Sequence, residues 1–144
     1  MNLSKEYSGK KVLVIGGLGF IGSNLVNSLC SFGAKVTVLT KSLEKVFNLE
    51  ELKDKLKIVI YSEDSLNEEV SKNDIIFDLA ENKISRQMSS DVDISPFLTD
   101  RKKLISICKT LKLSPRLVYT SSRLVYGLVN SENLPITEEL DPKP

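Results

Sequence analysis

The feature that most constrains this chain is a glycine-rich segment between positions 16 and 22. Four of the seven glycines in the 144-residue chain lie there. The apolar run of residues 12–15 precedes the segment and ends at its first glycine, which is typical of a buried parallel strand. Apolar residues at helical spacing follow it from Phe20 to Phe32. A strand, a glycine loop and a helix in this order predict the opening of a βαβ nucleotide-binding unit.

Each glycine of this segment has a predicted mechanical role. Glycine tolerates the positive φ angles of a sharp turn, and its missing side chain lets backbone approach a pyrophosphate. The helix that follows offers free N–H groups and a partial positive charge to phosphates. The predicted phosphate loop is Gly16, Gly17, Leu18, Gly19, Phe20, Ile21 and Gly22. No Lys-Ser/Thr pair follows Gly22, which excludes a P-loop, and the alternative is a tight turn that binds no ligand.

Strand-like and helix-like segments alternate along the rest of the chain. Further strands are predicted at residues 35–39, 57–61, 74–80 and 116–120, and helices at 43–56, 65–71 and around 104–111. The polar segment 81–93 has no clear helix or strand pattern, and the tail after Gly127 is predicted to be a loop. The pattern predicts an α/β fold of one domain, residues 1–144. Its architecture is a doubly wound Rossmann-type three-layer sandwich with a parallel sheet of about five strands.

Composition excludes several classes of function. A formal net charge of +1, from 20 basic and 19 acidic residues, gives no reason to expect nucleic acid or an anionic membrane as a partner. The chain has no histidine, and Cys30 and Cys108 lie far apart, so no metal site is predicted. Both cysteines are predicted to be buried, inert thiols. Without a signal-like segment or a long apolar run, the expected location is the cytoplasm, and the oligomeric state stays open.

The end of the second strand bears on the choice of nucleotide. NAD-binding units of this type usually place an acidic residue there, to bind the ribose hydroxyls. Here the strand ends in Thr40, Lys41 and Ser42, with no carboxylate before Glu44. Lys41 and Ser42 suit a 2′-phosphate, so the predicted cofactor is NAD(P) with a leaning towards NADP. The alternative is that Lys41 is an ordinary solvated surface charge.

Three segments carry a resemblance to the extended short-chain dehydrogenase/reductase family, especially its nucleotide-sugar epimerases and dehydratases. They are the glycine loop within residues 14–23, the segment 74–80 (DIIFDLA) and the segment 119–127 (YTSSRLVYG). The resemblance implies a Rossmann fold, an NAD(P) cofactor and a sugar-nucleotide substrate. It places Ser122 beside the reacting sugar hydroxyl or carbonyl, as an accessory catalytic group, although a loop-capping hydroxyl is the alternative. It also implies cofactor contacts for Asp64, Leu79, Ala80 and Thr120.

The chain departs from the pattern of this family at several positions. Asp78 stands where the family usually has histidine or a small polar residue, and Glu81 replaces an alanine. Phe97, Asp100 and Arg101 replace residues of the family's Asn-Val-x-Gly-Thr stretch. These changes make the nicotinamide side of the cofactor site less well defined by sequence than its pyrophosphate side.

The resemblance also implies a Tyr-x-x-x-Lys pair that this chain does not supply. Residues 135–144 are similar to the segment that precedes the pair, and Tyr7 and Lys11 match its spacing only by chance, because Lys11 opens the first strand. The expected function is therefore the NAD(P)-binding portion of a nucleotide-sugar epimerase, dehydratase or reductase, inactive alone and dependent on a C-terminal half for its substrate. The alternatives are a non-catalytic dinucleotide-binding or interaction module and a fold remnant that binds nothing.

Overall fold

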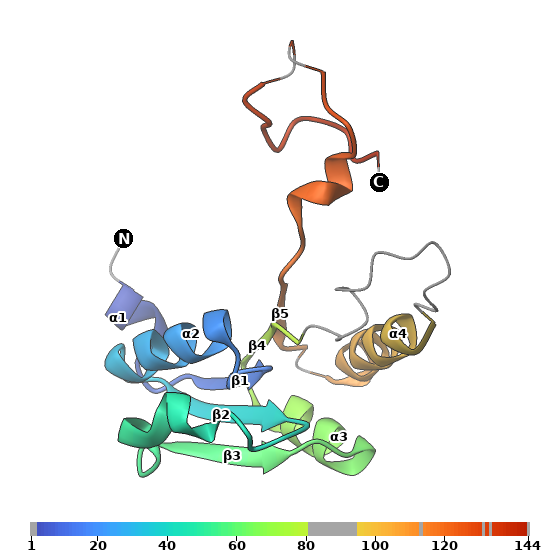
Figure 1. The fold of residues 1–144 in the computed structure, drawn as a ribbon. Helices are drawn as coiled ribbons and strands as arrows, with labels where there is room; N and C mark the ends of the chain where they lie inside the picture. Colours follow the sequence, from blue (N-terminus) through green and yellow to red (C-terminus); the bar gives the residue numbers. More distant parts are fainter. Residues whose placement is uncertain (1–2, 81–94, 113, 131, 133, 144) are drawn as a thin grey trace.

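Five parallel strands form one sheet in the computed structural model, which describes residues 3–80, 95–112, 114–130, 132 and 134–143. The strand order is β3-β2-β1-β4-β5 (Figure 1), as in a doubly wound Rossmann half. The strands are β1 (Lys11–Ile15), β2 (Lys35–Thr40), β3 (Leu56–Ile60), β4 (Ile75–Asp78) and β5 (Arg116–Tyr119). The predicted fold class is confirmed, and all five strands lie at the predicted places to within a few residues.

The register of the strands brings three carboxyl ends together. Ile15, the last residue of β1, pairs with Leu39 of β2 and with Asp78 of β4. The chain runs outward from β1 through β2 to β3 and then crosses back to β4 on the other side of β1. The order of the strands therefore reverses between β1 and β4, and ligands of such sheets bind at the carboxyl edge beside that point.

Helices cover both faces of the sheet. The helical elements are α1 (Leu3–Tyr7), α2 (Phe20–Ser31), the 3-10 helix η1 (Val46–Leu52), α3 (Glu63–Lys72), α4 (Ser95–Thr110) and the 3-10 helix η3 (Arg123–Tyr126). Val12 and Val14 of β1 pack with residues of α2 and η1, whereas Leu13 and Ile15 pack with residues of α3 and α4. Because successive strand residues point to opposite faces, β1 contributes to both cores and its apolar run is continuous.

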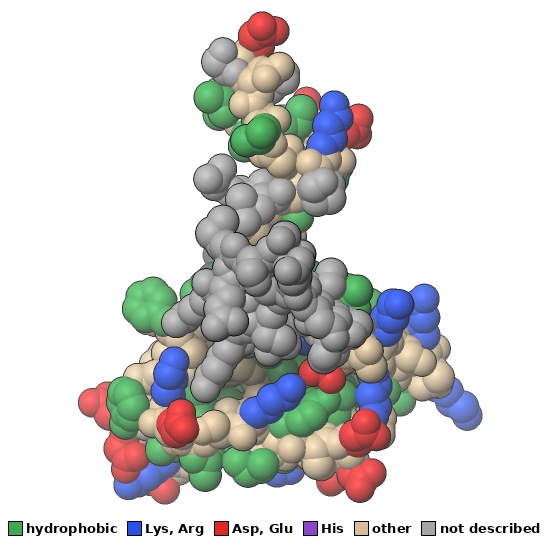
Figure 2. All heavy atoms as spheres, turned by 45° about the vertical axis from the view of Figure 1, so that its right-hand side comes forward, with side chains coloured by type: hydrophobic (Ala, Val, Ile, Leu, Met, Phe, Trp, Pro, Cys, Tyr) green, Lys and Arg blue, Asp and Glu red, His purple; other side chains and the backbone are tan. Residues whose placement is uncertain are grey.

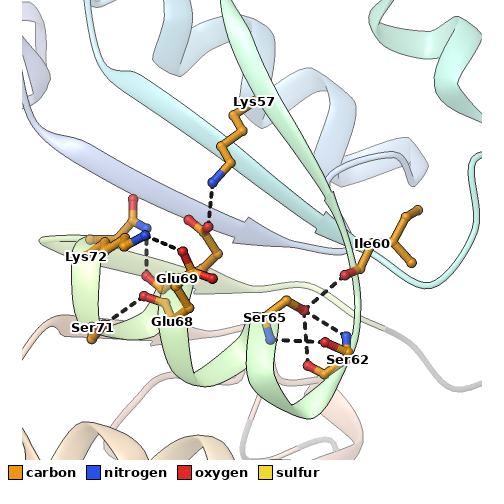
Figure 3. Close-up of polar contacts among 9 residues, drawn as sticks. Lys57, Ile60, Ser62, Ser65, Glu68, Glu69, Ser71 and Lys72 are labelled. Atoms are coloured by element: carbon orange, nitrogen blue, oxygen red, sulfur yellow. Dashed lines mark hydrogen bonds and ion pairs between the residues drawn. The ribbon is translucent and has the colours of Figure 1, made fainter.

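The segment after β5 and helix α3 are placed differently relative to the sheet. After β5 the chain leaves the sheet, so η3 and the residues beyond it extend away from the body of the domain (Figure 1). At the opposite edge strand of the sheet, β3, a capping box between Ser62 and Ser65 starts α3 directly after the strand. The buried Glu69 of α3 then pairs with Lys57 of β3 over 2.6 Å (Figure 3).

Among the described helices, none has the length and apolarity needed to cross a bilayer.

Two predictions about local structure are wrong. The segment 43–56 is not an α-helix: it holds η1, which is interrupted at Leu49 (φ −125°, ψ 17°), and Leu56 already belongs to β3. The segment is held by its buried Leu49 and by the Asn48 side chain, which donates to the Leu18 carbonyl (2.9 Å), rather than by an apolar stripe. Cys30 is only half-buried on α2, whereas Cys108 is buried as predicted.

Candidate functional site

A groove with a volume of about 500 Å³ lies at the carboxyl edge of the sheet, beside the point where the strand order reverses. The residues that line it are Gly16, Leu18, Gly19, Phe20, Ile21, Gly22, Thr40, Lys41, Ser42, Glu44, Lys45 and Leu79. All of these except Glu44 and Lys45 are predicted cofactor contacts. The tertiary structure thus gathers the glycine loop, the end of β2 and the end of β4 around one concave surface, as ligand sites of this fold require.

The glycine loop is folded tightly against the strand ends. Gly16 has a φ of +80°, in the left-handed region, and a Cβ there would lie 2.9 Å from the backbone nitrogen of Ala80. A Cβ on Gly22 would lie only 2.3 Å from the Gly16 carbonyl oxygen. A Cβ on Gly17 would lie 2.9 Å from a methyl group of Val38. These three glycines are required by the packing of the loop, whatever binds in the groove.

Gly19 differs from these three glycines. A Cβ on Gly19 would meet, within 4 Å and outside its own chain neighbours, only the Gly16 carbonyl oxygen, at 3.3 Å. Gly19 is also the N-cap residue of α2 and has no side chain to cap the helix. The first-turn N–H groups of an α-helix have no acceptor within the helix, and they carry its partial positive charge. A bare backbone and an uncapped helix start in one groove fit a pyrophosphate.

The end of β2 carries a cation that is already paired. The Lys41 Nζ lies 3.1 Å from an Asp100 carboxylate oxygen of α4 and 5.0 Å from the centre of the Tyr61 ring. Burial, and next the charge of Asp100, raise the pKa of the Tyr61 hydroxyl. Lys41 is therefore not an isolated surface charge. Asp100 supplies the carboxylate that the sequence around β2 lacks, from a position 59 residues away in the chain.

The end of β4 carries a buried ion pair. The Asp78 carboxylate, only 1% exposed, lies 2.7 Å from Nε of Arg101 on α4. Arg101 also donates through Nη2 to the Ala80 carbonyl, and its guanidinium lies 5.7 Å from the Tyr119 ring centre. Burial raises the pKa of Asp78, although the charge of Arg101 and the N–H of Ala80 act in the opposite direction. The fold thus brings Asp78 and Arg101, two expected departures from the resemblance, into contact.

The remaining predicted residues lie outside the set that lines the groove. The Thr120 N–H donates to the Asp78 carbonyl (3.2 Å), so Thr120 continues β5 beside the end of β4. Ser122 is exposed just before η3, and its carbonyl accepts from Val125 (3.1 Å). Asp64 is exposed in the first turn of α3. Their catalytic and cofactor roles stay predictions. Glu81 and the side chain of Phe97 lie outside the described part of the chain.

Charged side chains do not separate by sign on the face of the molecule shown in Figure 2. Over its lower part, Lys and Arg side chains are interspersed with Asp and Glu side chains. This distribution matches the nearly balanced formal charge of the sequence.

Comparison with known proteins gives a family match and several similar relatives. The family model described as the NAD dependent epimerase/dehydratase family matches residues 12–144. A UDP-N-acetyl-alpha-D-glucosaminuronate decarboxylase of Bacillus cytotoxicus is 29% identical, over 82% of this chain and 38% of its own length. Epimerase Mth375 of Methanothermobacter thermautotrophicus has a TM-score of 0.74 and 29% identity, over 97% of this chain and 43% of its own.

A further solved structure is the UDP-glucose 4-epimerase of Thermus thermophilus, in complex with NAD. Its TM-score is 0.75 and its identity is 25%, over 93% of this chain and 44% of its own length. The chain spans less than half the length of each of these three relatives.

Proposed function

Because the chain belongs to the NAD dependent epimerase/dehydratase family, we propose that it is the NAD(P)-binding portion of a nucleotide-sugar epimerase, dehydratase or reductase. The observation that carries the proposal is the opening at Gly19. There Gly19, which has no side chain, is the N-cap of α2 without a side-chain cap hydrogen bond, and it lines the groove together with the first turn of the helix. Phosphate groups bind helix starts of this kind through backbone N–H groups and the helix dipole.

The groove has room and chemistry for both ends of the dinucleotide's adenosine diphosphate half. The pyrophosphate would lie against Gly19 and the first turn of α2. The adenosine ribose would then lie towards Thr40, Lys41 and Ser42, which line the same groove. Lys41 and Ser42 support a modest preference for NADP(H), since an ammonium and a hydroxyl both bind a 2′-phosphate.

The substrate class rests on the relatives. The names of the Bacillus and Thermus proteins specify UDP-linked sugars as their substrates. The nucleotide-sugar substrate and the reaction are therefore proposals for this chain.

The chain by itself is proposed not to turn over a sugar nucleotide. Tyr7 ends α1 and Lys11 opens β1, so this pair does not lie on one helix face and does not form a tyrosine base assisted by a lysine. Ser122 would offer a hydroxyl to the substrate, but a serine hydroxyl is a poor base at neutral pH. The second candidate, a non-catalytic dinucleotide-binding module, is favoured by Arg101, which already engages Asp78 and Ala80 at the end of β4.

Calorimetric titration of the chain with NADH and with NADPH tests the proposal. Saturable binding of either cofactor at one site is expected. Binding of neither by a folded chain would refute it and would leave the fold remnant as the explanation.

A further inference from the structure

We propose that Asp100 of α4 is a specificity-determining residue, which disfavours NADP(H) by holding Lys41. The inference rests on the proposed dinucleotide binding and deepens it. It assigns a role at the adenosine end of the site to Asp100, which lies in α4, far along the chain from the glycine loop. Asp100 does not itself line the groove, so it acts through the groove-lining lysine.

Three elements meet at Lys41. The lysine directly follows β2, Tyr61 directly follows β3, and Asp100 comes from α4. The carboxylate of Asp100 lies 3.1 Å from the Lys41 ammonium, and the centre of the Tyr61 ring lies 5.0 Å from it. The ammonium thus contacts both an anion and an aromatic ring, and both interactions favour its present position.

The two cofactors differ by one group on the adenosine ribose. NADP(H) carries a 2′-phosphate on the adenosine ribose, where NAD(H) has a neutral hydroxyl. A phosphate approaching Lys41 has to displace Asp100 or share the ammonium with it, and two anions at one cation repel each other. A ribose hydroxyl brings no charge and can donate a hydrogen bond to a carboxylate. Asp100 therefore weakens the binding of the phosphorylated cofactor selectively.

The Lys41–Asp100 pair is too exposed to be a main support of the fold. The Lys41 side chain is 69% exposed and that of Asp100 is 38% exposed. Ion pairs of this kind add little to stability, because water and salt screen them. Replacing Asp100 is thus expected to leave the fold intact and to change mainly the charge beside the Lys41 ammonium.

The measured quantity is the ratio of the dissociation constants for NADH and NADPH, in wild type and in Asp100→Asn. The variant should raise this ratio by roughly three- to tenfold, through tighter NADPH binding, and should change NADH affinity by less than about twofold. Asp54→Asn is the matched control, because it removes one exposed carboxylate at the opposite, amino edge of the sheet. A Lys41→Ala/Asp100→Asn double variant should lose most of the gain, which separates an effect through Lys41 from a change in net charge.

The outcomes separate the two proposals. A ratio that rises in Asp100→Asn and not in Asp54→Asn supports the inference. Binding of both cofactors with an equal ratio in Asp100→Asn and wild type overturns the inference and leaves dinucleotide binding standing. An equal rise in Asp54→Asn, or in the double variant, also overturns it, because the effect would then not pass through Lys41. Failure of the folded wild type to bind either cofactor overturns both.

Discussion

Asp78 and Arg101 form an ion pair of 2.7 Å that joins the carboxyl end of β4 to the middle of α4. The same arginine donates to the Ala80 carbonyl, and the Ala80 backbone lies directly against Gly16 of the glycine loop. Arg101 is therefore connected to the proposed phosphate site through one strand end. The fold thus brings into contact two positions at which the sequence analysis expects a departure from the family pattern.

Replacing Arg101 with methionine should destabilise the chain strongly at neutral pH. The change leaves the Asp78 carboxylate, which is 1% exposed, without its cation. Breaking a buried pair on one side typically costs about 3–5 kcal/mol, and urea denaturation measures this loss in the free energy of unfolding. Lys102→Met, at the next and exposed position of α4, is the control and should change stability little. Asp78→Leu/Arg101→Met should regain most of the loss, and an equally unstable double variant would argue against the pair as the cause.

The effect of Arg101→Met should depend on pH in a defined direction. Burial raises the pKa of Asp78 in the folded chain, so its contribution to stability is fully present below the unfolded-state pKa and is lost as the pH rises through the folded-state pKa. Removal of Arg101 raises the folded-state pKa further. The stability difference between wild type and Arg101→Met should therefore shrink as the pH falls below 7, because Asp78 becomes protonated at a higher pH in the variant than in wild type. A difference that stays constant over this range would contradict the assignment to Asp78.

Gly19 and Gly22 should respond differently to substitution. Gly19→Val places a Cβ 3.3 Å from the Gly16 carbonyl, a close contact that a small shift relieves, at a residue that lines the groove, so the chain should fold and lose binding of NADH and NADPH. Gly22→Ala places a Cβ 2.3 Å from the same carbonyl, so this variant should lose stability first. Calorimetry for binding and thermal unfolding for stability distinguish the two. Unchanged affinity in a folded Gly19→Val chain would remove the main support for the site.

Lys41→Ala should weaken NADPH binding and affect NADH binding little. A charge-assisted contact to the 2′-phosphate is worth roughly 1.5–3 kcal/mol, which corresponds to about tenfold or more in affinity. Lys45→Ala is a matched control, because Lys45 lines the same groove but lies further along the chain from the end of β2. Tighter binding of NADH than of NADPH by wild type, or equal NADPH affinity in Lys41→Ala, would count against the preference for NADP(H).

The isolated chain should show no turnover of sugar nucleotides. Losing a general base typically costs about 10²–10⁴-fold in rate, and losing the positioning of the substrate can cost roughly 7–11 kcal/mol more. The assay follows NAD(P)H absorbance and epimer formation across common sugar nucleotides. Turnover that disappears in Ser122→Ala would show that these 144 residues already contain a complete active site.

The sequence was sufficient for those parts of the fold that depend on local pattern. The run of residues 12–15 and the helical spacing after Phe20 predict β1 and α2, because one strand and one helix face need only short-range periodicity. The α-helix predicted for segment 43–56 is wrong because the apolar residues of this segment are sparse. There a single buried Leu49 and the contact from Asn48 to Leu18 decide the conformation.

The sequence by itself determined the order of the strands, the glycine loop, and the groove-lining residues at the ends of β2 and β4. Each of these follows from residues adjacent in the chain, whose spacing fixes the turn or the face on which they lie. Only the tertiary structure decided that Asp100 meets Lys41 and that Arg101 meets Asp78. These contacts join α4 to the ends of β2 and β4, and the packing of a helix across a sheet depends on the whole core rather than on local spacing. The charge at the proposed ribose site is therefore a property of the folded chain, because its carboxylate comes from a distant helix.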